Sequence, residues 1–279
     1  MITPSEVDYI KSHAHVPEHI TNYVIAISGG EPFLFKDYLY YKFKSHLLLI
    51  GYPFKDPFNE KVLKEVLDNA VKSIKPEHVT LIAPEISVLN GIQDRKETDR
   101  YYKLNLSDLN ISQKLRNMIN RASRELRIEK KQEMGDEHIH LISEFLSSGR
   151  VGNDTRSIFE KIPKYISSVS TAWVFTARDK NGRLAGFDIA EFGAEEYAFY
   201  MFNFISREWY VPGASDLLLY EVVKEAREQG KPFINLGLGI NKGIILFKKK
   251  WGGIPFLDHK LYFYRQSYKD NLKSLFEKL

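Results

Sequence analysis

The sequence contains no cysteine, and this absence excludes disulfide bonds, thiolate nucleophiles and thiolate metal ligands. Neither sign of charge dominates, because 40 basic and 36 acidic residues leave a net charge of +4, so composition alone does not indicate a nucleic-acid partner. The polar N-terminus lacks the apolar segment of a secretory signal, and the longest apolar run near it, Leu47 to Ile50, is far too short to span a bilayer. We therefore expect a cytoplasmic protein without a membrane span.

The chain does contain enough apolar surface for ordinary globular domains. Hydrophobic residues make up 43% and charged residues 27% of its 279 residues, which is typical of a soluble globular protein. A chain of this length suits two domains of roughly 130 to 150 residues. Aromatic residues, at 13%, suit the half-buried face of a β-sheet.

The first half of the sequence predicts mixed α/β structure. Apolar or alternating runs predict strands at Asn22 to Ser28, Phe33 to Phe43, His46 to Gly51, Val79 to Ala83 and Arg100 to Leu106. Apolar residues at helical spacing predict a helix from Asn59 to Ile74 and a longer one from Ser107 to Lys131. The longer helix would present a basic face made of Arg116, Arg124, Arg127 and Lys131.

The second half predicts an α+β fold. Two helices, Glu137 to Phe145 and Thr155 to Ile166, precede three strands: Trp173 to Ala177, Leu184 to Phe192 and Tyr197 to Ile205. Asn181-Gly182 predicts the hairpin between the first two strands, because both residues tolerate positive φ. A helix capped by Ser215, a strand at Phe233 to Leu236, a helix at Asn241 to Lys250 and a strand at Leu261 to Tyr264 follow. Antiparallel strands feeding a strand–helix–strand crossover indicate a mixed sheet.

The most specific pattern lies near the C-terminus. A helix ends at Gly230, a strand follows, and the sequence continues with Gly243-Ile244, Phe247-Lys248 and Trp251-Gly252. This pattern resembles the GNAT superfamily of acyltransferases, in the branch that holds the Fem-type peptidoglycan aminoacyltransferases and the C-terminal domain of phosphatidylglycerol lysyltransferase. The stretch from Tyr101 to Arg127 is similar to the segment that joins the two halves of proteins in that branch.

The resemblance implies two GNAT-like lobes, each a mixed and mostly antiparallel sheet with helices packed on it. The N-terminal lobe would span residues 1–132, including the long connecting helix, and the C-terminal lobe residues 133–279. The acyl donor would bind in the C-terminal lobe, where the strands Tyr197 to Ile205 and Phe233 to Leu236 diverge.

A donor's phosphates would be held at the loop before the next helix. Free amides and the helix dipole attract anions there, so Gly213, Ala214 and Ser215 are the candidate donor-binding residues. The run Trp209 to Ala214 departs from the Gln/Arg-x-x-Gly-x-Gly/Ala pattern of acyl-CoA loops, since Pro212 lacks an N–H and Asp216 adds negative charge. The departure disfavours CoA and is compatible with an aminoacyl-tRNA; an ordinary strand-to-helix turn is the alternative interpretation.

Several other side chains are candidates for chemistry in this lobe. A base could come from Asp188, Glu191, Glu195, Glu196 or Glu208, and we favour Asp188 and Glu208 because burial among apolar residues raises a carboxyl pKa. Tyr264, or Tyr262, could protonate a leaving group. Lys248 occupies the lysine position of the family pattern, and Asn241 could hydrogen-bond the donor. Each carboxylate, tyrosine and asparagine also has an ordinary structural interpretation.

The basic residues suggest a nucleic-acid contact, whereas the histidines do not suggest a metal. Arg116, Arg124, Arg127 and Lys131 could bind the phosphates of a tRNA, although a solvated helix face would have the same composition. His13, His15 and His19 have poor spacing for one helix face and no carboxylate cluster beside them, so no metal site is predicted.

These observations favour an N-acyl or aminoacyl transferase that uses an acyl-CoA or an aminoacyl-tRNA as co-substrate, with no tightly bound cofactor. The acceptor would be an amine on a small molecule or peptide. Two alternatives remain: a non-catalytic ligand-binding or regulatory protein on the same fold, and an enzyme that aminoacylates a phospholipid headgroup.

Overall fold

The computed structural model describes residues 2–85, 93–147 and 152–265. Contacts divide the chain into two compact units: the first unit comprises Met1–Glu6, Gly30–Asp99 and Leu257–Leu279, and the second unit comprises Val7–Gly29 and Arg100–Phe256. Each unit thus combines segments that are far apart in the sequence. The division into lobes at residues 1–132 and 133–279 was inferred from a resemblance and stays a prediction.

The first unit is a small mixed sheet with one helix packed on it. Its strands lie in the order β1-β2-β3-β4-β11, antiparallel except for the β3–β4 pair. Helix α3 begins at Asn59, whose side-chain oxygen accepts hydrogen bonds from the amides of Lys61 and Val62. The elements are β1 (Glu31–Phe35), β2 (Tyr38–Phe43), β3 (His46–Ile50), α3 (Glu60–Ile74), β4 (His78–Ala83) and β11 (Ile254–Arg265).

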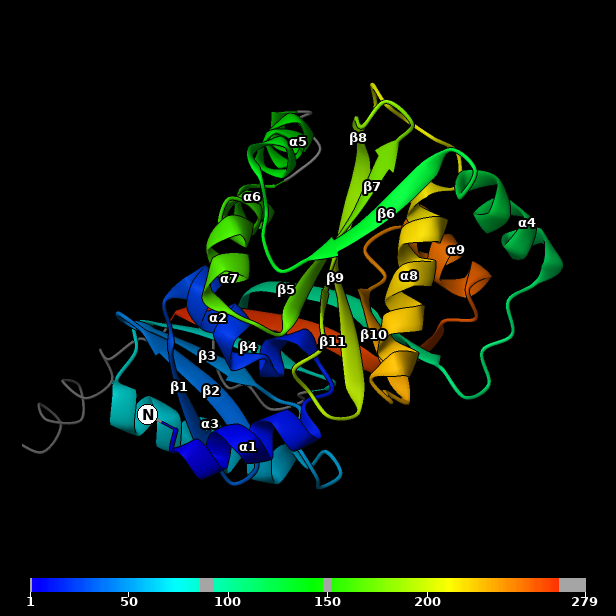
Figure 1. Ribbon diagram of the computed structural model, residues 1–279. Helices are drawn as coiled ribbons and strands as arrows, with labels where there is room; N and C mark the ends of the chain where they lie inside the picture. The colour runs from blue at the N-terminus through cyan, green and yellow to red at the C-terminus, as the bar shows by residue number, and fades with distance from the viewer. Residues whose placement is uncertain (1, 86–92, 148–151, 266–279) are drawn as a thin grey trace, which may run out of the picture. The chain divides into compact units, whose positions relative to one another are not determined.

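The second unit is built on a larger mixed sheet in the order β5-β10-β9-β8-β7-β6 (Figure 1). Only the β9–β10 pair is parallel, as expected for strands joined through a crossover helix. The strands are β5 (Gln93–Asn105), which belongs to this unit from Arg100 on, β6 (Leu126–Lys131), β7 (Ala172–Asp179), β8 (Leu184–Glu191), β9 (Tyr197–Ile205) and β10 (Phe233–Leu238).

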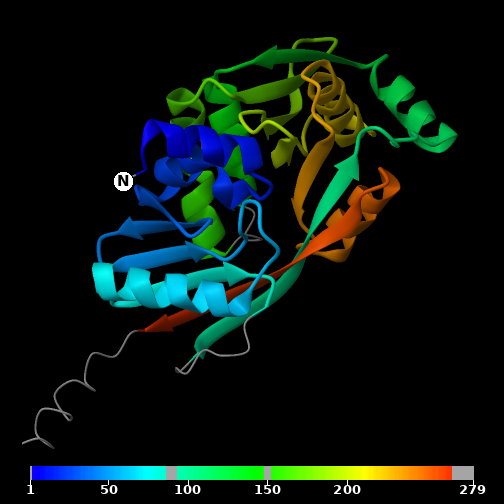
Figure 2. The ribbon, with the colours of Figure 1, turned by 90° about the horizontal axis from the view of Figure 1, so that it is seen from below.

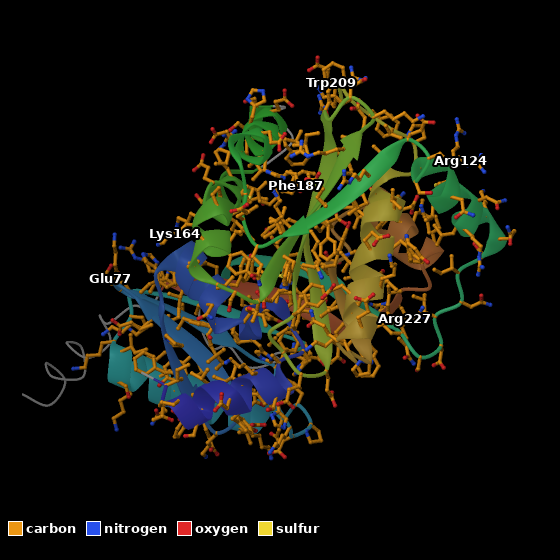
Figure 3. The ribbon with its side chains drawn as sticks, viewed as in Figure 1. Glu77, Arg124, Lys164, Phe187, Trp209 and Arg227 are labelled. Carbon is orange, nitrogen blue, oxygen red and sulfur yellow. The ribbon has the colours of Figure 1, made fainter. Side chains whose placement is uncertain are left out.

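Helices cover both faces of this sheet (Figures 1 and 2). One face carries α4 (Gln113–Ala122), α8 (Ala214–Glu228) and α9 (Lys242–Lys250), and we call it the α8 face. The opposite face carries the N-terminal segment, with α1 (Pro4–His13), η1 (Pro17–His19) and α2 (Thr21–Ser28), together with α5 (Asp136–Ser147), α6 (Asn153–Phe159) and α7 (Ile162–Ser168). Phe187 of β8 lies in the core between the sheet and α5–α7 (Figure 3).

Most predicted elements are confirmed, and the α+β class is the one observed. The strand expected at Asn22 to Ser28 is wrong, because this run forms α2, which ends at Gly29 (φ 72°) with the Gly29 amide bonded to Ile25. A short apolar run does not distinguish a strand from a buried helix. The single strand expected at Phe33 to Phe43 is a hairpin that turns at Lys36 and Asp37, both at positive φ.

The long connecting helix expected from Ser107 to Lys131 is also wrong. Helix α4 is capped by the Ser112 hydroxyl, which accepts from the Leu115 amide, and it ends at Ala122. The chain then forms β6, whose backbone completes the hydrogen bonds of β7. The helix expected from Thr155 to Ile166 is two helices, with Pro163 in the first turn of α7.

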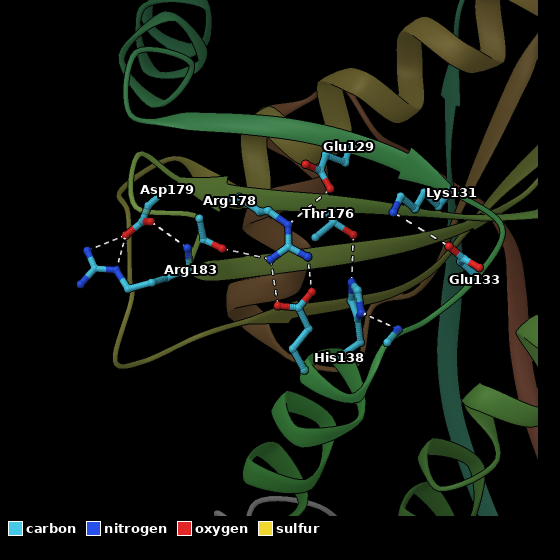
Figure 4. Close-up of polar contacts among 11 residues, drawn as sticks. Glu129, Lys131, Glu133, His138, Thr176, Arg178, Asp179 and Arg183 are labelled. Atoms are coloured by element: carbon cyan, nitrogen blue, oxygen red, sulfur yellow. Dashed lines mark hydrogen bonds and ion pairs between the residues drawn. The ribbon is translucent and has the colours of Figure 1, made fainter.

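A buried histidine anchors the start of α5 to the sheet (Figure 4). The amide of Gly135 donates to His138 Nδ1 at 3.1 Å, so Nε2 carries the ring proton and donates to Thr176 Oγ1 of β7 at 2.9 Å. Burial lowers the pKa of His138, which keeps the ring neutral.

An arginine reinforces the same junction at the surface. Arg178 of β7 donates from Nε to Glu129 at 3.3 Å and from Nη1 to Glu137 at 2.8 Å (Figure 4). The hydrogen bonds from Arg178 lower the pKa of Glu137. The helix α5, which follows β6 in the chain, is therefore held against β6 and β7 by charged groups as well as by its apolar face.

None of the helices in the described ranges combines the length and the apolar character that crossing a membrane requires.

We predict that Thr176→Val lowers the free energy of unfolding by about 1 to 3 kcal/mol, because it leaves the buried His138 N–H without an acceptor. The measurement is a urea titration followed by circular dichroism. The exposed variant Thr98→Val should change stability by less than about 0.5 kcal/mol. The double variant His138→Leu/Thr176→Val should recover part of the loss, since neither partner is then left unpaired. A double variant less stable than Thr176→Val would contradict this account.

Candidate functional site

The parallel pair β9–β10 separates at the centre of the second unit. The two strands pair at Phe233 with Tyr197, Ile234 with Ala198 and Asn235 with Phe199, and their remaining residues, all of them described, do not pair with each other. The register skips Met201 between β9 and β8 and Leu236 between β10 and β5. Such bulges bend and twist a strand. We call the place where β9 and β10 part the fork; the divergence expected from the sequence is present.

Lys248 of α9 brings an ammonium group to the fork. The residue is only 4% exposed, and its Nζ donates to the carbonyl of Leu238 at the end of β10. A Cβ atom added to Gly237 would lie 3.9 Å from Lys248 Nζ and 3.9 Å from the carbonyl oxygen of Tyr200 on β9. The charge therefore lies between the two diverging strands, where water has little access.

The turn after α9 explains why Lys248 is held in this position. The amide of Gly253 donates to the Lys248 carbonyl at 2.8 Å. A Cβ at Gly253 would lie 2.7 Å from that carbonyl oxygen and 2.9 Å from Leu236, so only glycine allows this approach. At the other end of α9, Asn241 Oδ1 accepts from the Ile244 amide at 3.0 Å. Asn241, which was predicted to contact the acyl donor, therefore serves as the N-cap of α9.

A buried carboxyl group lies beside the fork on the α8 face. Asp188 of β8 is 0% exposed; its Oδ1 accepts from Asn203 Nδ2 at 2.5 Å, and Asn203 Oδ1 accepts from the Ser215 hydroxyl at 3.4 Å. Within the described part of the chain, Asp188 Oδ2 and Tyr200 Oη have no hydrogen bond of acceptable geometry, although the two groups are close enough to affect each other's pKa.

Burial controls the protonation of this pair. It raises the pKa of Asp188 to about 8, although the Asn203 amide and the nearby Tyr200 hydroxyl oppose the shift. Burial, and then the Asp188 charge, raise the pKa of Tyr200 well above its usual value. The raised pKa that the sequence analysis expected for Asp188 is therefore found.

A second carboxylate occupies the first turn of α8. Asp216 is 3% exposed, and its Oδ1 accepts from Trp251 Nε1 at 3.0 Å and pairs with Lys250 Nζ at 2.5 Å. A carboxylate in this position already interacts favourably with the positive end of the helix dipole. An incoming phosphate would meet this negative charge.

Gly213 and Ala214, two of the residues predicted to bind the acyl donor, have structural roles at the start of α8. Gly213 (φ 86°) is the residue that caps α8, so the cap expected at Ser215 is wrong. A Cβ at Gly213 would lie 3.0 Å from Met118 Cγ, which shows that α4 packs directly on the start of α8. Ala214 is buried in the core of the α8 face. Position 213 requires glycine because its φ is positive and because a side chain would meet Met118.

The other two predicted catalytic residues lie outside β9, β10 and α9. Glu208 is exposed in the loop before α8. Tyr264 lies on the part of β11 that belongs to the first unit, and its side chain falls outside the described residues.

The basic face expected on one long helix is divided between two elements. Arg116 lies on α4 and Arg124 just beyond its end, whereas Arg127 and Lys131 lie on β6. All four are exposed, and Lys131 lies 3.9 Å from Glu133. The prediction that they share a helix face is wrong, because the chain changes from helix to strand at Leu126.

Two polar residues near the fork, Tyr200 and Glu18, were not among the site residues predicted from the sequence. Tyr200 lies in an aromatic run in which every residue suited a core strand, so no local signal marked it. Glu18 lies in the polar N-terminal segment, and only the fold brings it to the sheet. Among the described residues, no three His, Asp or Glu side chains gather in an arrangement that could hold a metal ion.

The sequence matches no family model and no curated protein. Solved structures do match. FemX is 15% identical, with 99% of this chain and 98% of that chain covered and a TM-score of 0.60. The C-terminal domain of a putative lysylphosphatidylglycerol synthetase from Agrobacterium fabrum is 15% identical, with 98% and 95% covered and a TM-score of 0.57. A tandem GNAT protein from the clavulanic acid biosynthesis pathway is 11% identical, with 93% of each chain covered and a TM-score of 0.55.

At these identities the likeness is one of fold. It extends over nearly the whole chain. The chain therefore has the GNAT-like tandem fold that its sequence indicated.

Proposed function

We propose that the protein is an acyltransferase that moves an acyl or aminoacyl group from an activated donor to an amine, with the reacting carbonyl placed at the fork. The observation that carries this proposal is the buried ammonium of Lys248 between the diverging strands β9 and β10. Attack on a carbonyl builds negative charge on its oxygen, and a cation already fixed in a site of low dielectric constant stabilises that charge.

The donor-binding face supports an aminoacyl-tRNA over an acyl-CoA. Asp216 already lies at the start of α8, and Pro212 supplies no amide to a pyrophosphate. Helix α4, in contrast, contains no acidic residue and presents Lys114, Arg116 and Arg121 to solvent, with Arg124 just beyond its C-terminal end, where the chain leads into β6 (Figure 3). In the described structure none of these four side chains makes an ion pair. A polyanion therefore suits α4 better than the α8 N-terminus.

The remaining roles follow from position and protonation. The sequence suggested Asp188 as a base, but the group is protonated below a pH of about 8, so we give it the role of an acid that returns a proton through Tyr200 to the leaving group of the donor. Gly213, Ala214 and Ser215 keep their proposed role in holding the donor near α8. Glu208 keeps its proposed role as a proton acceptor. Tyr264 keeps its proposed role as a proton donor, in addition to Asp188.

One observation favours a second candidate, a non-catalytic binding protein. Asp188 is completely buried, and α4 packs on Gly213 at the start of α8, so side chains of the protein itself occupy part of the donor face. Donor binding without transfer would support this candidate.

We predict that alanyl-tRNA raises the melting temperature of the protein more than acetyl-CoA does, because a ligand that binds only the folded state stabilises it.

Gel-shift titrations with tRNA at several salt concentrations should show that the binding constant of wild-type protein depends more steeply on salt than that of Arg116→Ala/Arg121→Ala/Arg124→Ala. The log–log slopes should differ by about 0.7 to 0.9 for each phosphate that the variant no longer binds.

The matched control for this triple variant is Lys61→Ala/Lys64→Ala/Lys72→Ala, which removes as many exposed charges from α3. Its salt dependence should equal that of wild-type protein. An equally reduced salt dependence in both triple variants would contradict a docking role for α4, and no stabilisation by either donor would contradict the proposed function.

We predict that Lys248→Met lowers kcat by about 100- to 1,000-fold, since it removes the cation that faces the developing oxyanion. Donor affinity, measured by fluorescence anisotropy, should change much less than kcat. Lys249→Met, which changes the exposed neighbour, should retain wild-type kcat. A decrease confined to KM would show that Lys248 contributes to binding alone.

We predict that activity falls as the pH rises through about 8, because the proton on Asp188 is lost there. Asp188→Asn should lower kcat and remove that part of the pH profile.

The pH dependence of stability checks the raised pKa of Asp188 independently of activity. The folded-state pKa is raised, so the folded protein keeps a proton that the unfolded chain releases above its ordinary carboxyl pKa, and the free energy of unfolding should decrease from a pH of about 4 to 8. The variant should reduce this decrease. A reduced decrease with an unchanged activity profile would show that the raised pKa has no catalytic role.

A further inference from the structure

The N-terminal segment covers the face of the fork opposite to Lys248. Residues Tyr197 and Phe199 of β9 alternate onto this face and pack with Ala14 and Ile20 of the segment. Asn235 of β10 is completely buried and donates from Nδ2 to the His15 carbonyl at 2.8 Å. The segment therefore follows the strands up to the point at which they part.

A carboxylate of this segment, Glu18 in η1, contacts the sheet beside the fork. Its Oε2 accepts from the hydroxyl of Tyr101 on β5 at 2.8 Å. Burial raises the pKa of Glu18, and the Tyr101 hydrogen bond opposes the shift. The residue as a whole is partly exposed, whereas its carboxyl group is largely desolvated.

Glu18 and Lys248 approach the same end of β10 from opposite faces. Tyr101 is the register partner of Leu238, and the Leu238 carbonyl is the group that accepts from Lys248 Nζ. Tyr102, the next residue of β5, points to the other face, where Lys248 Nζ lies 5.7 Å from its ring centroid. The strand end thus separates a cation on the α8 face from a carboxylate on the N-terminal face.

Acyl transfer to an amine needs a positive partner for the carbonyl oxygen and a base for the amine. The oxygen of the reacting carbonyl requires a positive partner, while the amine approaches across the plane of the carbonyl and must lose a proton. An amine that is charged in solution has no lone pair available for attack until that proton has been removed. A partly desolvated carboxylate both attracts the ammonium and accepts its proton.

We propose that Glu18 binds the ammonium of the acceptor and removes its proton, and that Tyr101 positions the carboxylate for this step. The inference rests on the proposed function and names its acceptor as a primary amine that is cationic at neutral pH. One ammonium proton passes to Glu18, and the freed lone pair attacks the carbonyl carbon to form the carbon–nitrogen bond. The bond from that carbon to the donor's leaving oxygen, or to sulfur in acetyl-CoA, breaks, and the leaving atom receives a proton from Asp188 through Tyr200. The nitrogen then loses its second proton, which restores the proton on Asp188, and Glu18 releases its proton to water.

The test compares two nucleophiles on the same bound donor, alanyl-tRNA or acetyl-CoA. Glycinamide is cationic at neutral pH and needs a base, whereas hydroxylamine is neutral and does not. Glu18→Gln should lower transfer to glycinamide by about 100-fold or more. Transfer to hydroxylamine should stay within about threefold of wild type, because donor binding and the oxyanion partner are intact. Asp8→Asn, which changes an exposed carboxylate of the same segment, should behave as wild type with both nucleophiles.

Equal decreases with both nucleophiles would show that Glu18 supports the fold, and no decrease with glycinamide would show that another group takes the proton; either result overturns the inference. Wild-type protein that binds neither donor, or that transfers to neither nucleophile, would overturn the proposed function and the inference with it. Wild-type transfer combined with an unaffected Glu18→Gln variant would overturn the inference alone.

A second variant covers the case in which Glu18→Gln does not fold. Tyr101→Phe removes the hydrogen bond that lowers the pKa of Glu18, so that pKa should rise. Because the carboxylate form is the active one, the rise of glycinamide transfer with pH should move to higher pH, and the hydroxylamine profile should not move. A glycinamide profile that stays in place would overturn the inference by this second route.

Discussion

The separation of β9 from β10 is the constraint on which the rest of the second unit depends. Their parallel pairing ends at Phe199 and Asn235, and each strand stays in the sheet only through its other neighbour, β8 or β5. Backbone groups at such a place need other partners, since an unpaired buried amide or carbonyl is costly. Asn235 Oδ1 accepts from the Gly237 amide, and Lys248 satisfies the Leu238 carbonyl. The polar side chains that could carry chemistry are therefore also the ones that the parted strands require.

The buried carboxyl groups around the fork differ in the number of hydrogen-bond donors that they meet. Asp216 has two donors, Trp251 and Lys250, whereas Asp188 has one short contact to Asn203 and an unpaired second oxygen. A buried carboxyl group that lacks donors keeps its proton to a higher pH, as Asp188 does. The same physical effect raises the pKa of Glu18 on the other face. The arrangement combines a fixed cation at the fork with carboxyl groups on both sides whose pKa values are raised by burial.

The sequence pattern predicted an element correctly where the periodic segment was long or where the turn residues were unambiguous. The helix from Asn59 to Ile74 and the hairpin at Asn181-Gly182 are both observed. Prediction failed where tertiary pairing overrides local preference. Residues 126–131 continue a helical pattern yet form β6, because the edge of β7 offers them a ladder of hydrogen bonds. The basic face expected along that helix was divided for the same reason.

The sequence by itself determined the order and type of most elements, the α+β class, and the positions of Lys248 and Asp188 on elements whose periodicity is clear. Only the tertiary structure decided which groups meet. Tyr101 and Glu18 are 83 positions apart, and Trp251 and Asp216 are 35 positions apart, so neither contact has a local signature. Burial is likewise a property of the folded chain, because the desolvation that raises the Asp188 pKa comes from neighbours supplied by other segments. Periodicity records which face of an element is covered, and the fold alone specifies what covers it.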